Sequence, residues 1–453
     1  MIAVRGLALV AALAGCDLEH TIGLSVDPGR VRLVERALRF ERRDAIDALL
    51  VLDDSAAMGP AQQRLRPELP RIVGLLADAN AMRSVHVGVI TTDLGAPGIS
   101  CGHARGGRLI PVGAAAPTGC LPPTATPWLT VTAQSANTPT GQPLDQTLAC
   151  MTSVGEAGCG FEMPLEAARR QLLAPSGDDL GFLRDEALLV VVFLTNEDDC
   201  SVEPSADVLG TNPGYGPLTS FRCARYGLYC DGDLIGEQPA RYTTCRPANA
   251  GDGGRLVEVS IYQALFGAPL GQGGAKADPG DVVIAGLHAP DAPVEVVAAS
   301  GAAACGPGAG SCAALAHSCV QSDDASVFGD PAVRLHTLVA AGGGVSRSIC
   351  EPSYRPFADE LVARVEAAAV GAACVPGALV DPDAADCTVS VRGDSLRRCG
   401  APEDGGPCWR VVEDRGCVEQ VDPRDGTTQR RRLQLNGLER AGAAARCRVL
   451  SAI

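Results

Sequence analysis

The sequence contains no C-x-x-C pair and, after Cys16, no apolar run long enough to cross a membrane. Its most regular cysteine series, Cys305, Cys312 and Cys319, is spaced by seven residues, which does not match the ligand spacing of zinc or iron–sulfur sites. Metal–thiolate proteins are thereby excluded. Acidic side chains also outnumber basic ones, 53 to 38, which gives a formal net charge of −15. A surface that binds nucleic acid or anionic lipid must instead supply basic side chains to the phosphates. We therefore expect neither of these two partners.

The first sixteen residues have the layout of an export signal. A short amino-terminal region with Arg5 is followed by an apolar stretch, residues 6–13, and by two small residues before Cys16. The apolar stretch is too short to span a bilayer. We therefore expect export, with everything beyond Cys16 held outside the cytoplasm.

The cysteine content fits an oxidising compartment. Without Cys16 the nineteen cysteines leave eighteen, a density that is hard to explain in a reducing compartment. Twelve of them precede residue 371 and six follow it. Both counts are even, so each part of the chain is able to close its own disulfides, although their pairing cannot be deduced from sequence.

Apolar segments of two kinds alternate in the first four fifths of the chain. Nearly continuous apolar runs of strand length lie at residues 46–52 and 187–194, and further strand-like segments lie at residues 85–92 and 281–287. Helical periodicity lies at residues 60–79, 160–173, 331–341 and 354–369. Pro67 and Pro70 should kink the first helix. The alternation predicts an α/β fold with a doubly wound, mainly parallel sheet, whose ligand sites lie at the carboxyl ends of the strands.

The remaining stretches define the domain organisation. Long disulfide-rich insertions are expected near residues 94–158, 200–280 and 290–330 of a domain that spans 44–370, the first of them without much regular structure. Residues 17–43 are expected to be a tether and lead-in strand. Short apolar segments between Gly and Asp turns predict a small cysteine-containing β module over residues 371–453.

Leu13-Ala14-Gly15-Cys16 resembles the lipobox of bacterial lipoproteins, in which the cysteine becomes the mature N-terminus and carries a diacylglyceryl group. The resemblance implies that residues 1–16 are a signal peptide and lipobox and that Cys16 is the lipidation site. Stable anchoring needs more than one acyl chain, which that pathway supplies. We expect a lipid-anchored protein of a bacterial cell envelope, at the outer membrane or a periplasmic face.

The segment from Asp47 to Met58 resembles the first strand and metal-site loop of von Willebrand factor A domains, whose pattern is D-x-S-x-S. Residues 87–93 and 191–200 are similar to two further strands of that family. Gly181-Phe182-Leu183-Arg184, Gly158-Cys159-Gly160-Phe161-Glu162 and Ser348-Ile349-Cys350 resemble a group of bacterial lipoproteins that carry this domain. The likeness covers roughly residues 44–370 and implies a Rossmann-like fold.

The resemblance also implies a divalent cation, Ca²⁺ or Mg²⁺, which is held by loop oxygens. A carboxylate of the partner would complete the coordination of that cation. Its ligands here would be Asp53, Ser55, Asn196 and Asp198. The site is degenerate, because Ala57 replaces the second serine and Asn196 stands where an aspartate is expected. Mg²⁺ demands near-octahedral oxygen geometry, whereas Ca²⁺ is more tolerant. Substitute oxygens are available in loops at the same edge, from Asp54, Asp93, Glu197, Asp198 and Asp199.

A purely structural role for the first of these residues is the competing interpretation. Asp53, Asp54 and Ser55 lie just ahead of a predicted helix, where carboxylates and hydroxyls satisfy free backbone N–H groups and complement the helix dipole.

We expect a binding role toward another protein or an envelope polymer, without catalytic chemistry. One alternative is an extracytoplasmic serine hydrolase that uses Ser100 in the string from Gly98 to Gly102, although the strand and helix that a nucleophile elbow requires are not predicted around it. A passive structural protein of the envelope is the other alternative. Arg392-Gly393-Asp394-Ser395 spells a string that some integrins bind, and we interpret it as a solvated turn.

Overall fold

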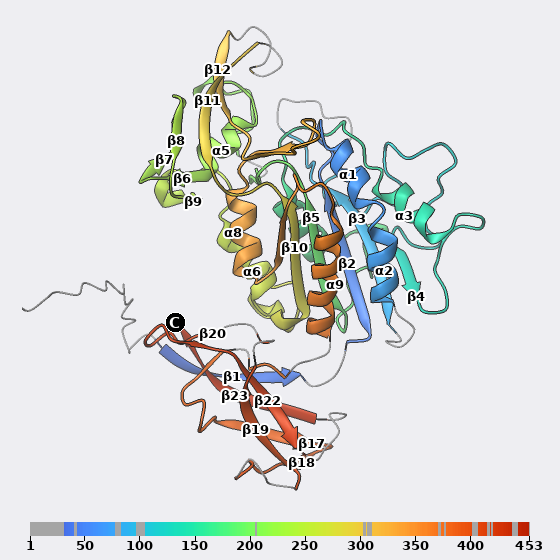
Figure 1. Ribbon diagram of the computed structural model, residues 1–453, viewed down its shortest axis with the longest axis vertical. Coiled ribbons are helices and arrows are strands. Elements are labelled where there is room, and N and C mark those ends of the chain that lie inside the picture. The colour runs from blue at the N-terminus through green and yellow to red at the C-terminus, as the bar shows by residue number, and fades with distance from the viewer. Residues whose placement is uncertain are drawn as a thin grey trace, which may run out of the picture. The chain divides into compact units, whose positions relative to one another are not determined.

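The computed structural model describes residues 31–39, 43–77, 83–96, 105–203, 206–301, 305, 310–369, 373–375, 377–400, 406–414, 417, 420–436 and 443–452. The chain splits into two compact units, Phe40–Ala372 and a second one built from Met1–Arg39 with Ala373–Ile453 (Figure 1). Cys16 and the string from Gly98 to Gly102 lie outside the described residues. No helix in the described ranges is long and apolar enough to cross a membrane.

A six-stranded sheet forms the centre of the larger unit, with the strand order β15-β10-β5-β2-β3-β4. Its strands are β2 (Ala45–Leu52), β3 (Ser84–Thr91), β4 (Leu129–Thr132), β5 (Leu188–Leu194), β10 (Val282–His288) and β15 (Val345–Ser348). All neighbours pair in parallel except β4, which runs antiparallel to β3. The predicted strands at residues 46–52, 85–92, 187–194 and 281–287 are therefore confirmed within a residue or two.

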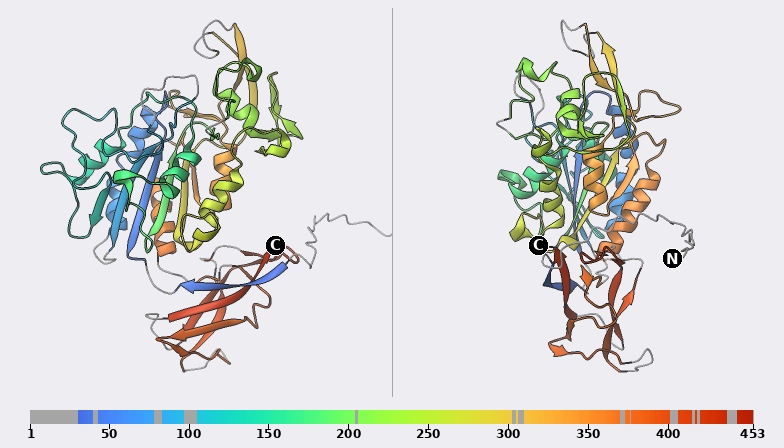
Figure 2. Two further views of the ribbon diagram at one scale, coloured as in Figure 1. Left: turned by 180° about the vertical axis from the view of Figure 1, so that it is seen from behind. Right: turned by 90° about the vertical axis from the view of Figure 1, so that its left-hand side faces the viewer.

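Helices cover both faces of this sheet (Figure 2). One core joins the sheet to α1 (Gly59–Leu65), α2 (Leu69–Leu76), α3 (Leu144–Thr152) and α9 (Arg355–Ala369), and the other joins it to α4 (Pro164–Leu173), α6 (Val259–Gly267) and α8 (Val333–Ala341). Successive strand residues point to opposite faces. Leu50 therefore belongs to the first core and Leu49 and Val51 to the second, which is why β2 and β5 are apolar at almost every position.

The helix predicted over residues 60–79 is broken into α1 and α2. Pro67 lies in the turn between them, and Pro70 lies in the first turn of α2, where its missing N–H costs nothing. Helix α6 and strand β15 were not predicted. The first insertion is also more regular than expected, because it contributes β4 to the sheet and α3 to one core.

The later insertions form small antiparallel sheets beside helix α5 (Phe221–Gly227). They contain β6 (Leu228–Cys230), β7 (Asp233–Leu234), β8 (Ala240–Tyr242), β9 (Cys245–Pro247), β11 (Val294–Ser300), β12 (Ser311–Leu315), β13 (Cys319–Val320) and β14 (Phe328–Gly329). Disulfides in the larger unit join Cys120 to Cys150, Cys200 to Cys223, Cys230 to Cys245, Cys305 to Cys312, and Cys319 to Cys350. Each bridge closes a loop and so limits the conformations that the unfolded chain can adopt.

The smaller unit consists of antiparallel strands. Its elements are β1 (Val31–Arg39), β16 (Ala378–Leu379), β17 (Cys387–Val391), β18 (Asp394–Ser395), β19 (Cys408–Glu413), β20 (Gln420–Val421), β21 (Thr428–Gln429), β22 (Arg431–Asn436) and β23 (Ala443–Ala452). Its disulfides join Cys374 to Cys417, Cys387 to Cys447, and Cys399 to Cys408. Strand β1, from the segment expected to be a tether and lead-in, pairs along its whole length with β23.

The predicted fold class is wrong as a description of this chain. The structure is mixed, with 24% helix and 29% strand, and its named strands fall into seven sheets, of which six contain only antiparallel pairs. Parallel strands need long crossover connections, which exist only around the six-stranded sheet. Short neighbouring strands such as β6 and β7, or β17 and β18, are joined by tight turns, which favour antiparallel pairing. A doubly wound, mainly parallel arrangement therefore does not describe the chain.

Candidate functional site

The carboxyl ends of three central strands finish at the same level. Leu52 at the end of β2 is opposite Thr91 of β3 and Leu194 of β5. The next residue of each strand therefore lies at one edge of the sheet. The ladder continues into them, because the Asp53 N–H donates to the Leu194 carbonyl at 2.9 Å and the Thr92 N–H donates to the Leu52 carbonyl at 3.2 Å. The register thus brings together polar side chains that lie far apart in the sequence.

Asp53 is the centre of this edge and is fully buried. Its Oδ1 accepts from the Ser55 N–H at 2.7 Å, and its Oδ2 accepts from the Thr195 hydroxyl at 2.8 Å. Burial raises the pKa of Asp53, and the hydrogen bonds from Ser55 oppose that rise. Two donors therefore hold the carboxyl group in one orientation.

These residues do not cap the helix that follows them. Helix α1 begins at Gly59. Its N-cap residue is Met58, whose side chain makes no capping hydrogen bond. The Gly59 N–H donates instead to Glu156, at 3.0 Å. The helix-capping role weighed for Asp53, Asp54 and Ser55 is therefore not what the structure shows.

Glu162 joins the edge from the loop before α4, and the residue-based reasoning missed it as a site residue. It is buried and accepts a hydrogen bond from the Thr92 hydroxyl. Burial raises the pKa of Glu162 well above its ordinary value, and the nearby charge of Asp53 raises it further. The available signal was an acidic residue at the end of the Gly158-to-Glu162 segment, directly before a helix.

Several buried oxygen atoms at this edge lack a hydrogen-bond partner among the described residues. They are Asp54 Oδ1, Ser55 Oγ, Asp93 Oδ2, Glu162 Oε1 and Asn196 Oδ1. Each buried acceptor left unpaired costs about 1–3 kcal/mol. We call this set, together with Asp53, the edge cluster. Its unpaired oxygens are the feature that most needs an explanation.

Burial and repulsion between neighbouring carboxylates both raise pKa values in the edge cluster. Burial raises the pKa of Asp54 to about 8, with further contributions from the charges of Asp53 and Asp93. Gly158 closes the cluster on the Asp54 side, because its N–H donates to the Asp54 carbonyl at 2.7 Å and a Cβ atom there would lie 2.7 Å from Asp54 Oδ1. With a pKa of about 8, the Asp54 carboxyl group retains its proton at neutral pH unless a cation replaces it.

Asp198 is not part of the edge cluster, so the expected ligand set needs correction. Its two carboxylate oxygens accept from the Arg334 N–H at 3.0 Å, and Oδ1 also accepts from the Leu335 N–H at 3.0 Å. These are free amides in the first turn of α8, so Asp198 has a helix-capping role. Of the other three residues expected as ligands, Asp53 and Ser55 are joined by a hydrogen bond, and Asn196 follows β5 with a buried, unpaired Oδ1.

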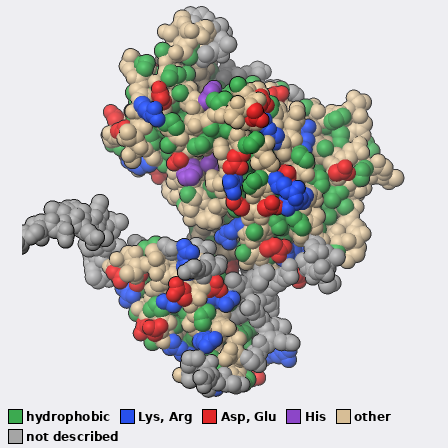
Figure 3. Space-filling model, viewed as in Figure 1, with side chains coloured by type: hydrophobic (Ala, Val, Ile, Leu, Met, Phe, Trp, Pro, Cys, Tyr) green, Lys and Arg blue, Asp and Glu red, His purple; other side chains and the backbone are tan. Residues whose placement is uncertain are grey.

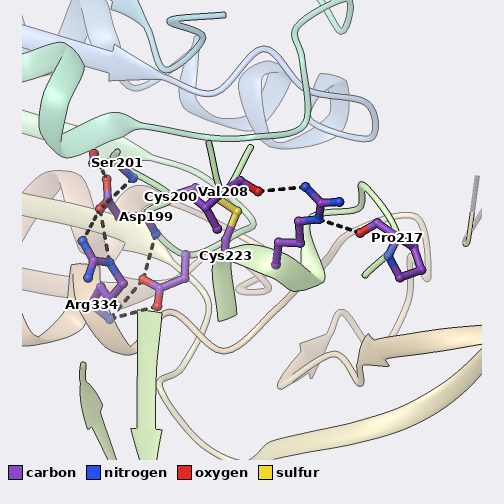
Figure 4. The surroundings of a disulfide bond; sticks show 9 residues. Asp199, Cys200, Ser201, Val208, Pro217, Cys223 and Arg334 are labelled. Carbon is purple, nitrogen blue, oxygen red and sulfur yellow. Dashed lines mark hydrogen bonds and ion pairs between the residues drawn. A yellow bond between two sulfur atoms is a disulfide. The ribbon is translucent and has the colours of Figure 1, made fainter. Parts of the chain in front are cut away.

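Asp199 is also engaged elsewhere, as Figure 4 shows. Its carboxylate forms a buried ion pair with Arg334 at 2.9 Å and accepts from the Ser201 hydroxyl at 2.6 Å. The adjacent Cys200 is bonded to Cys223, and its N–H donates to the Glu162 carbonyl at 2.7 Å. This network ties the loop after β5 to the segment that carries Glu162.

The donor set of the edge cluster fits a hard cation better than a soft one. In the part of the chain that the structure describes, no three His, Cys, Asp or Glu side chains converge as a metal site. A cation would therefore also need the neutral oxygens of Ser55 and Asn196. All five unpaired atoms are oxygens, the ligands that Ca²⁺ and Mg²⁺ prefer.

Two further predictions concern surface features. Arg392 and Gly393 both have positive φ and form the turn between β17 and β18, which confirms that the Arg-Gly-Asp-Ser string is an exposed turn. On the face of the larger unit drawn in Figure 3, acidic and basic side chains are interspersed among the coloured, described residues.

No family model matches this chain. No curated protein matches it either. The family resemblance inferred from its motifs therefore stays a prediction.

Among solved structures, the chain is similar to the pilus adhesin SpaC from Lactobacillus rhamnosus GG in its open conformation, with a TM-score of 0.33 and 11% identity over 94% of this chain and 41% of that chain. It is also similar to the pilus adhesin RrgA from Streptococcus pneumoniae, with a TM-score of 0.30 and 8% identity over 94% of this chain and 59% of that one. The human COPII-coat protein Sec24c gives a TM-score of 0.28 and 10% identity, over 92% and 46% of the two chains. The chain thus spans less than two thirds of each of these proteins, and such low scores establish neither a shared fold nor a shared function.

The compartment is indicated more directly by the cysteines. Eight disulfides join described cysteines in both units. Such a density is typical of proteins that fold outside the reducing cytoplasm. The chain is therefore an extracytoplasmic protein.

Proposed function

We propose that this protein is a lipid-anchored binding protein of a bacterial cell envelope, attached through Cys16, whose edge cluster contacts another protein or an envelope polymer through a divalent cation. The observation that supports this proposal is the group of buried, unpaired oxygens at the carboxyl ends of β2, β3 and β5 and in the loop that carries Glu162. No catalytic chemistry is part of the proposal.

The residues that would hold the cation are Asp53, Ser55, Glu162 and Asn196, with Asp54 beside them. When bound, a divalent cation would neutralise these carboxylates and attract a carboxylate of the partner. Thr195 and the Ser55 amide orient Asp53, and Thr92 orients Glu162. This support reduces the rearrangement that binding requires.

Ca²⁺ is the better candidate of the two hard cations. It accepts six to eight oxygen ligands in flexible geometry, whereas Mg²⁺ requires a near-ideal octahedron. The cluster offers oxygens of unlike chemistry, with the Asn196 amide where an additional carboxylate is expected. Because cation binding displaces protons from carboxyl groups of raised pKa, the affinity should increase with pH.

Thermal unfolding in the presence of CaCl₂, MgCl₂ or EDTA tests the proposal. At a free cation concentration ten times its Kd, bound cation would stabilise the folded state by about 1.4 kcal/mol, which corresponds to a Tm rise of a few degrees. The rise should disappear in Asp53→Asn and in Glu162→Gln.

Asp198→Ala is the matched control, because it removes an acidic side chain from the same loop but only uncaps α8. It should lower Tm while keeping the full response to Ca²⁺. An identical Tm with Ca²⁺ and with EDTA at pH 8 would contradict a cation site. Cross-linking pull-downs from native membranes that recover no partner would favour a passive structural role instead.

A further inference from the structure

A half-open pocket lies directly beside the edge cluster. Its volume is about 360 Å³, at the lower end of the range for small-ligand sites. The apolar part of its wall consists of Leu94, Ala96, Met163 and Val202, and the polar part includes Arg170 and Glu203. The pocket is therefore large enough for an aliphatic side chain and is lined to accept one.

The pocket and the edge cluster share a wall. Leu94 directly follows Asp93, and Met163 directly follows Glu162. The Met163 N–H donates to the Thr92 carbonyl at 3.0 Å, which joins the two segments of that wall. Consecutive Cα atoms are about 3.8 Å apart, so a peptide whose carboxylate reached the cluster would place a neighbouring side chain at the pocket within one or two residues.

The surroundings of the pocket are rigidly held. Met163 and Val202 belong to a separate apolar cluster that also contains the disulfide-bonded Cys200 and Cys223. Arg222, the residue before Cys223, is buried and donates to the carbonyls of Val208 and Pro217, at 2.8 and 2.9 Å (Figure 4). A pocket supported in this way needs little reorganisation on binding.

The charges at the pocket are balanced. The Arg170 guanidinium forms an ion pair with Glu166 at 3.0 Å, and Glu203 is exposed. Neither sign of charge dominates, so selection by the pocket would rest on apolar contact.

Resting on the function proposed above, we propose that this pocket receives an aliphatic side chain of the partner, next to the acidic residue that reaches the edge cluster. The recognised chemistry is then an acidic–aliphatic peptide segment. The cluster would select the carboxylate, and the pocket would select its neighbour.

Fluorescent peptides measure this selection directly by anisotropy. The probes are pentapeptides with fluorescein at the N-terminus and an amidated C-terminus, with the sequences Gly-Leu-Asp-Leu-Gly, Gly-Ala-Asp-Ala-Gly and Gly-Leu-Asn-Leu-Gly, each tested in millimolar CaCl₂ and in EDTA. The Leu-Asp-Leu peptide should bind about ten-fold more tightly than the Ala-Asp-Ala peptide, because burial of the additional methylene groups is favourable.

Two variants of the pocket wall test the location. Ala96→Leu narrows the pocket and should remove the preference for leucine, whereas Leu173→Ala, an exposed position on α4, should leave it unchanged. Val202→Ala widens the pocket and should shift the preference from leucine to phenylalanine at the same positions. A gain for phenylalanine cannot arise from misfolding.

The outcomes separate this inference from the function on which it rests. Equal affinity for the leucine and alanine peptides, with Ca²⁺ dependence retained, would overturn the pocket and leave the cation site standing. A leucine preference that persists equally in EDTA and with the asparagine peptide would support the pocket and overturn the cation site. No binding of any peptide at millimolar concentration would overturn the pocket.

Discussion

The Thr92 hydroxyl donates a hydrogen bond to the carboxylate of Glu162, which lies seventy positions further along the chain. Thr92 follows β3, and Glu162 precedes α4 after the whole first insertion. The contact holds an acidic side chain against Asp53, although burial and the charge of Asp53 both raise the pKa of Glu162. The chain therefore maintains an arrangement of carboxyl groups that opposes its own ionisation, which a site for a cation or for a retained proton would explain.

Stability should decrease with rising pH because of this cluster. Burial raises the pKa of Asp54 from 3.8 to about 8. Between these values the folded state binds more protons than the unfolded state, so the free energy of unfolding falls as the pH rises and levels off above about pH 8. Relative to Asp54→Asn, the wild type should lose about 3–4 kcal/mol between pH 5 and pH 8.

Urea denaturation at several pH values in EDTA measures this difference. Asp233→Asn, at an exposed position, is the control and should follow the wild type. Parallel curves for the wild type and Asp54→Asn would contradict the raised pKa. Saturating Ca²⁺ should flatten the decrease, because the cation takes the place of the protons.

The buried pair of Asp199 and Arg334 should be costly to break. Both side chains are fully buried, and the guanidinium of Arg334 also donates to the Val257 carbonyl at 2.7 Å. Asp199→Asn leaves an uncompensated buried charge and should lower the free energy of unfolding by about 3–5 kcal/mol. The double variant Asp199→Leu, Arg334→Met should recover much of that loss, and a double variant no more stable than Asp199→Asn would argue against this account.

Removal of the Cys200–Cys223 disulfide should affect both stability and the edge cluster. Replacement of both cysteines by serine should cost about 2–4 kcal/mol, and it should weaken the Ca²⁺ response, because the Cys200 N–H binds the Glu162 carbonyl. The Cys305–Cys312 disulfide closes a loop of only seven positions. Its removal is the control and should cost less and leave the Ca²⁺ response unchanged. Equal effects of the two replacements on that response would contradict a link between Cys200 and the cluster.

Lipid attachment at Cys16 predicts the behaviour of the expressed protein. Metabolic labelling with a palmitate analogue should mark the wild type, which should fractionate with membranes. Cys16→Ser should lose the label. Mass analysis that finds an intact initiator methionine and an unmodified Cys16 in natively purified protein would contradict the anchor.

Some features followed from the residues alone. The run at 187–194 is apolar at every position and the run at 46–52 at every position but Asp47, which requires burial on both faces, and each proved to be a central strand with helices on either side. The even cysteine counts on either side of residue 371 agree with described disulfides that each join cysteines of one unit. Asp53, Ser55 and Asn196 could be predicted as ligands because the loops after those strands resemble a known metal-site pattern.

The other features of the fold and of the site depend on tertiary structure alone, because contacts between segments far apart in the chain leave no local sequence pattern. Val31 lies opposite Ala452, so β1 joins a unit whose other strands come from the far end of the chain. Two adjacent carboxylates received different environments, since Asp198 meets the free amides of α8 and Asp199 meets Arg334. Glu162 reached the cluster only through the path of the loop before α4. Composition and periodicity indicate which residues must be buried. The residues that a buried side chain contacts depend on the path of the whole backbone.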